Sequence, residues 1–92
     1  MRLTFRVHAV QRMFARRIGE ADVRVVVEIG RTIRAYPDDT PYPSRLILGF
    51  AGGRPLHVVA ADVPGSDEVI IITVYEPDPA LWNDTFDKRS QQ

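Results

Sequence analysis

The sequence contains 92 residues, of which 45% are hydrophobic and 26% are charged, as is ordinary for a soluble globular protein. This length suits one small domain, so we expect residues 1–92 to fold as a single domain. The absence of cysteine excludes a disulfide scaffold, a cysteine zinc site, an iron–sulfur cluster and a thiol nucleophile.

The apolar stretches of the chain are all short. The N-terminal segment MRLTFRVHAV returns to charged residues too soon to contain the apolar core of a signal peptide. The longest fully apolar run, residues 69–72, is far too short to cross a bilayer. We therefore expect a cytoplasmic protein with no membrane partner.

The net charge of zero conceals an uneven distribution. Residues 1–34 carry eight arginines and three carboxylates, while residues 35–92 carry four basic and nine acidic residues. If these two parts separate on the folded surface, one face is cationic and can meet phosphates or an acidic partner. The alternative interpretation is that the arginines only solvate a surface helix.

The first predicted element is a helix from Arg6 to Ile18. Apolar residues recur there at helical spacing, and Thr4 is placed to act as the N-cap. The pattern assigns Val10, Phe14 and Ile18 to its apolar face.

A second helix is predicted from Glu20 to Ile29, with Gly30 as its stop signal. The β-branched run VRVVVE favours a strand by propensity alone. Because Ala21, Val25 and Ile29 share one helical face, we predict a helix.

Four extended segments follow, at Thr32–Tyr36, Arg45–Ala51, Arg54–Val63 and Glu68–Glu76. A Gly-Gly pair and a PGSD segment make tight turns between the last three, which should form an antiparallel meander. The predicted fold class is α+β, with two N-terminal helices packed on one face of a three- to four-stranded antiparallel sheet.

A candidate binding stripe lies on the first predicted helix. His8, Arg12 and Arg16 are four residues apart, which stacks their side chains along one side of a helix. Two guanidiniums in a stripe can hold a phosphate, and the imidazole adds a titratable group at the end of that stripe. The alternative is an ordinary exposed polar face.

Three further candidates lie on the predicted strands. His57 interrupts the apolar run RPLHVVAA, and Thr73 and Tyr75 share one face of the last strand. A lone histidine in such a strand is most often a hydrogen-bonded core residue. The combination nevertheless supplies the base, acid and fixed cations that metal-independent RNA cleavage requires. No HxxxH or HxxE spacing suggests a metal site, and we expect no cofactor.

Four segments resemble the DUF4258 family: HAVQRMFARRI at 8–18, YPDDTPYPSRLILG at 36–49, GRPLHVV at 53–59 and ITVYEPDPALW at 72–82. This family in turn is similar in layout to small RelE/ParE-like toxins. The resemblance implies a toxin of a bacterial type II toxin–antitoxin pair, an endoribonuclease that acts on RNA, free or on the ribosome. It also implies a small zinc-finger-type antitoxin as protein partner.

On this interpretation the catalytic residues are His8, His57 and Tyr75, and the residues that hold RNA or its phosphates are Arg12, Arg16, Arg54 and Thr73. One histidine acts as base and the other as acid, while Tyr75 orients the substrate. The competing hypothesis is a non-catalytic protein-binding module. A solvent-accessible His57 favours the enzyme, and a His57 that is buried and bonded to main chain favours the binding module.

Trp82 and Phe86 stand four residues apart in the acidic C-terminal segment. They are candidates for docking an antitoxin or a second copy of the chain in a homo-oligomer. The alternative is a flap that covers a sheet edge or the bottom of the core.

Overall fold

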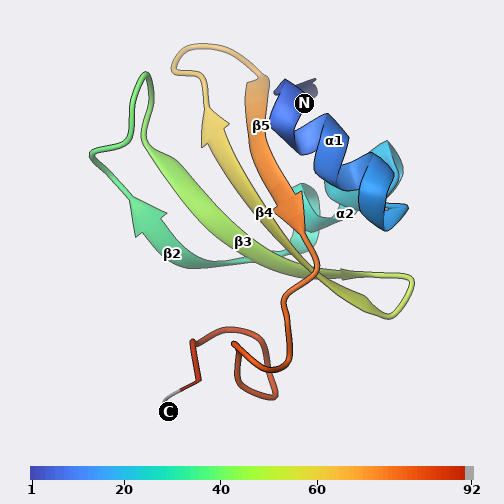
Figure 1. Cartoon of the computed structure of the whole chain (residues 1–92). Helices are drawn as coiled ribbons and strands as arrows, with labels where there is room; N and C mark the ends of the chain where they lie inside the picture. The colour runs from blue at the N-terminus through green and yellow to red at the C-terminus, as the bar shows by residue number, and fades with distance from the viewer. Residues whose placement is uncertain (91–92) are drawn as a thin grey trace.

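The computed structural model describes residues 1–90 of the chain. Two helices and five strands follow one another in an α+β arrangement (Figure 1). In chain order they are β1 (Arg2–Phe5), α1 (Val7–Arg16), α2 (Glu20–Ile29), β2 (Arg31–Tyr36), β3 (Ser44–Ala51), β4 (Arg54–Asp62) and β5 (Glu68–Tyr75).

The five strands form one mixed sheet in the order β1-β5-β4-β3-β2. Neighbouring strands are antiparallel except β1 and β5, which pair in parallel with Arg2 opposite Glu68. The expectation of three to four antiparallel strands is therefore wrong in strand number and in one pairing. β1 has four residues, and its partner lies more than sixty positions away, so no local turn signals the pairing.

The predicted bounds of α2 are confirmed, whereas α1 is shorter than predicted and runs from Val7 to Arg16. Thr4 does not cap α1. It lies in β1, where its hydroxyl donates to the Glu68 carboxylate over 2.7 Å, and Arg6 occupies the N-cap position.

Both helices contribute to one core, but α1 does so through an unexpected face. Ala9 is buried and Met13 packs against the core, while Val10 and Phe14 are exposed, Phe14 to 88%. α1 follows β1 after a single residue, so the strand fixes which side of the helix meets the sheet. The small Ala9 lies on that side.

α2 packs against β3 and β4. Its buried residues are Val23, Val26 and Val27. A Cβ built on Gly49 of β3 would lie 3.0 Å from a methyl group of Val26, so the glycine lets the helix approach the strand closely. The face predicted from the sequence is therefore wrong: Ala21, Val25 and Ile29 are all exposed.

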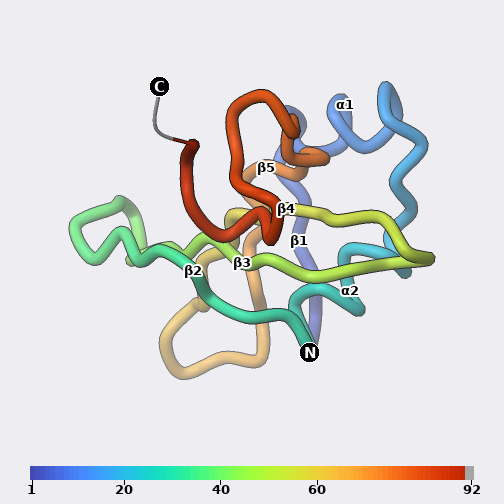
Figure 2. The backbone as a smooth tube through the Cα atoms, turned by 90° about the horizontal axis from the view of Figure 1, so that it is seen from below, coloured from blue at the N-terminus to red at the C-terminus, as the bar shows by residue number. Residues whose placement is uncertain are grey.

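The segment from residue 78 to residue 90, which we call the tail, has no regular helix or strand. An isolated antiparallel bridge joins Trp82 to Arg89. Figure 2 shows the tail on the opposite side of the sheet from α2. Within residues 1–90, no helix is long and apolar enough to cross a membrane.

Candidate functional site

Three of the candidates, His57, Thr73 and Tyr75, lie on the sheet face that points away from α2, which we call the front face. Leu56 and Val58 of β4 belong to the core that α2 covers, so the intervening His57 points to the front. Leu48 and Tyr75 are its partners on the neighbouring strands, and cross-strand partners project to the same side.

His57 is fully enclosed, with 0% of its surface exposed. Its Nε2 lies 2.7 Å from the main-chain carbonyl oxygen of Phe86, and its Nδ1 lies 3.1 Å from the hydroxyl of Tyr75. Because a carbonyl only accepts, Nε2 carries the proton and donates to Phe86, and Nδ1 accepts from Tyr75. Both ring nitrogens are therefore used.

The surroundings keep this pair uncharged. Burial lowers the pKa of His57 below its ordinary 6.5, and the hydrogen bond to the Phe86 carbonyl opposes this shift. Burial likewise raises the pKa of the Tyr75 hydroxyl, and Tyr36 adds to the effect while Arg89 opposes it. A neutral imidazole and a protonated phenol follow at neutral pH.

The tail encloses His57. The Trp82 ring meets the imidazole at a centroid distance of 4.4 Å and an interplanar angle of 88°. Phe86, whose carbonyl accepts from His57, has a left-handed backbone with φ of 61°. Trp82 and Phe86, expected to dock a partner, thus lie partly buried against the sheet in the manner of the flap.

Asp87 anchors this part of the tail. Its carboxylate accepts from the Thr85 hydroxyl at 2.7 Å, the Asn83 amide at 3.0 Å and the Arg31 guanidinium at 3.2 Å. These three donors hold the pKa of Asp87 well below its usual range. Arg31 belongs to β2, so this ion pair ties the tail to the sheet.

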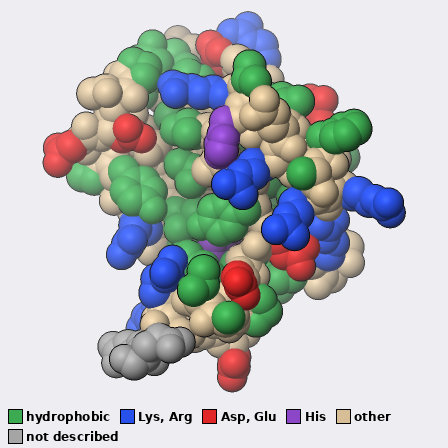
Figure 3. Space-filling model, viewed as in Figure 1, with side chains coloured by type: hydrophobic (Ala, Val, Ile, Leu, Met, Phe, Trp, Pro, Cys, Tyr) green, Lys and Arg blue, Asp and Glu red, His purple; other side chains and the backbone are tan. Residues whose placement is uncertain are grey.

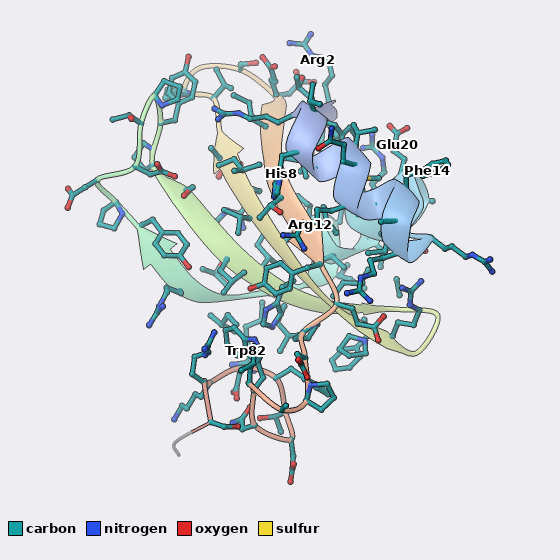
Figure 4. The ribbon with its side chains drawn as sticks, in the orientation of Figure 1. Arg2, His8, Arg12, Phe14, Glu20 and Trp82 are labelled. Carbon is teal, nitrogen blue, oxygen red and sulfur yellow. The ribbon has the colours of Figure 1, made fainter. Side chains whose placement is uncertain are left out.

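The stripe on α1 differs from His57 in being open to solvent. His8, Arg12 and Arg16 are all exposed. Figure 4 shows His8 and Arg12 extending from α1 on the side that faces β5. Since His57 has no exposed surface, the two histidines do not share an open cleft in this conformation.

The Arg54 guanidinium bonds to other groups of the protein. Its guanidinium donates to the main-chain oxygens of Arg16 and Arg17 at 2.9 and 3.1 Å, and it pairs with the Glu76 carboxylate at 3.0 Å. These bonds satisfy carbonyls at the C-terminal end of α1. Thr73, the remaining candidate, is half-buried on β5 opposite Val59.

Sequence reasoning missed two partners in this site, the Phe86 carbonyl and Asp87. A main-chain oxygen carries no residue-specific signal, and Asp87 looks like any other acidic residue of the segment. An Asx-type NDTFD pattern is the one local hint, because Asn83 and Asp87 bond within it. Among residues 1–90, no group of three or more histidine, aspartate or glutamate side chains gathers as a metal site would require.

Comparison with known proteins gives one match. The model of the family described as a domain of unknown function, DUF4258, matches residues 5–76. Neither the curated proteins nor the solved structures contain a match. Because the matched region covers most of the chain, from the last residue of β1 to the end of β5, the chain belongs to the DUF4258 family.

Proposed function

We propose that this protein is a toxin-type endoribonuclease that holds RNA on its front face, beside α1. The observation that carries the proposal is the exposed stripe of His8 and Arg12, which extends on the β5 side of the helix (Figure 4). Arg16 continues the stripe by one turn. Guanidinium groups are strong, bidentate ligands of phosphate, which suits them to this surface.

The proposed reaction is internal transesterification of RNA. His8 removes the proton of a 2′-hydroxyl, whose oxygen attacks the adjacent phosphorus. The 5′-oxygen of the next nucleotide leaves and takes a proton from water, which yields a 2′,3′-cyclic phosphate. Arg12 and Arg16 stabilise the negative charge that develops on the phosphorus oxygens.

His57 has a supporting role in this proposal. Its nitrogens are occupied by Tyr75 and Phe86, so it positions these two groups and does not transfer a proton to RNA. Water as the proton donor makes the reaction slower than one in which two histidines act as acid and base.

The second candidate is a non-catalytic module that binds a protein such as a zinc-finger-type antitoxin. The enclosure of His57 favours it, because that histidine then only builds the fold. The exposed apolar residues of α1 also favour it: Val7 and Phe14 are 72% and 88% exposed. Large apolar side chains at such exposure are typical of interaction surfaces when they cluster.

The experiment that separates these candidates is incubation of the purified protein with a labelled single-stranded RNA, followed by product analysis. We expect 2′,3′-cyclic phosphate ends, a rate lowered about 100-fold or more by His8→Ala, and weaker RNA binding by Arg12→Gln. Arg24→Gln is the charge control, since Arg24 lies on α2 and bonds to the Met1 carbonyl.

Intact RNA and no RNA binding by the folded wild type would refute the proposal in favour of the binding module. Equal cleavage by wild type and His8→Ala would refute the role of His8.

A further inference from the structure

A second basic surface lies where β2 meets the tail. Arg34 of β2 and Leu46 of β3 are cross-strand partners, and the side chain of Leu46 alternates with the core residue Ile47. Arg34 therefore projects toward the front face. Trp82 and Lys88 of the tail line the same hollow.

This hollow, which we call the Trp82 pocket, has a volume of about 210 Å³. Its apolar wall consists of Ile33, Leu46 and Trp82, and its cations are Arg34, Lys88 and Arg89. The Arg89 guanidinium lies 5.6 Å from the centre of the Trp82 ring, in a cation–π contact that holds the pocket wall.

The positive charge of the pocket is not compensated within the described chain. Among residues 1–90, no carboxylate forms an ion pair with Arg34, Lys88 or Arg89. Asp87 also lines the pocket, but its carboxylate already accepts from Arg31 and from two tail side chains. Three cations beside low-dielectric apolar walls favour an anionic ligand.

We propose that the Trp82 pocket binds a phosphate group of the RNA that crosses the front face. This inference rests on the proposed function and adds a second phosphate contact to the α1 stripe. Lys and Arg side chains gather on both sides of this face, with hydrophobic side chains between them (Figure 3). An RNA chain held at α1 and at the tail spans that apolar middle, where its bases and sugars meet the sheet.

The pocket contains its own reporter, because Trp82 is the single tryptophan of the chain. The experiment follows Trp82 fluorescence while a short single-stranded RNA or inorganic phosphate is added at constant ionic strength. The test variant is Arg34→Gln with Lys88→Gln, which removes two charges and leaves the Arg89 contact and the tail hydrogen bonds in place. The control is Arg2→Gln with Arg24→Gln, which removes two charges away from the pocket.

We expect both ligands to change Trp82 emission in the wild type and the control. The test variant should weaken RNA binding about tenfold. It should also reduce the slope of log affinity against log salt by about 0.7, the contribution of one single-strand phosphate contact.

The other outcomes separate the pocket from the proposed function. Phosphate binding without RNA binding would support the phosphate pocket and overturn RNA as the source of the phosphate. A different result would be RNA binding, seen by anisotropy, with unchanged Trp82 emission and with full affinity in the test variant. That result would refute the pocket without contradicting the α1 site. No response to either ligand would overturn the inference.

Discussion

His57 donates a hydrogen bond from Nε2 to the main-chain oxygen of Phe86, 2.7 Å away and 29 positions later in the chain. This bond joins the middle of β4 to the tail. It makes His57 a structural link between the sheet and the tail, and it leaves His8 as the solvent-exposed histidine.

The first prediction concerns the pH dependence of stability. Because the pKa of His57 is lowered in the folded protein, the unfolded chain binds its proton at higher pH than the folded protein does. The free energy of unfolding should therefore fall as the pH drops below about 6.5, by up to ~1.4 kcal/mol per pH unit, and not change through His57 above it.

Urea unfolding at about pH 8 and about pH 5 measures this effect in the wild type and in His57→Gln. The variant should lose the His57 contribution, so its decrease in the free energy of unfolding between these two pH values should be smaller than that of the wild type. The same decrease in both proteins would show that His57 titrates normally.

The second prediction concerns the anchor of the tail. Asp87→Asn removes the charge that pairs with Arg31 and weakens the bonds from Thr85 and Asn83, so the tail should detach more often and uncover His57. Modification by diethyl pyrocarbonate, read residue by residue by mass spectrometry, should be several-fold faster at His57.

The control is Asp84→Asn, which removes an exposed carboxylate from the same segment. Equal His57 modification in Asp87→Asn and the wild type would mean that Asp87 does not hold the tail.

The third prediction separates the two contacts of Arg54. Arg54→Met removes the bonds to the Arg16 and Arg17 carbonyls together with the Glu76 ion pair, and should lower the free energy of unfolding by about 1–2 kcal/mol. Glu76→Gln removes only the half-exposed ion pair and should cost less than about 0.5 kcal/mol. Denaturant unfolding measures both, and equal losses would contradict a capping role for Arg54.

The fourth prediction compares the glycines at the two ends of α2. A Cβ on Gly30 would lie 2.3 Å from the Val26 oxygen and 2.7 Å from an Ile47 methyl group, so Gly30→Ala should cost about 3 kcal/mol. A Cβ on Gly19 meets only an Asp22 oxygen at 3.5 Å, and Gly19→Ala should cost less than about 1 kcal/mol. Thermal unfolding of both variants tests this, and similar melting temperatures would contradict the steric argument.

Where the signals were local, the predicted elements agree with the structure. The glycines on either side of α2 signalled its two ends, and the structure confirms the predicted bounds. The tight turns between β3, β4 and β5 predicted an antiparallel meander, and the strand pairings confirm it. The DUF4258 motifs placed the family correctly.

The helix faces were harder to predict, because an apolar pattern marks a helix but not the side that meets the sheet. Val10 and Phe14 have the right spacing for a core face, yet α1 buries Ala9 and packs through Met13. The orientation of α1 depends on β1, whose pairing with β5 closes a loop of more than sixty residues.

By itself the sequence determined the class of fold, the second helix, the meander and the family, because neighbouring residues encode turns, caps and periodicity. Only the tertiary structure decided that β1 joins the sheet as an additional strand, which face of α1 is buried, and that His57 is enclosed. The enclosure of His57 depends on a main-chain oxygen and on an ion pair between Arg31 and Asp87, 56 positions apart. Contacts of this kind form only when distant segments meet, so no local pattern reports them.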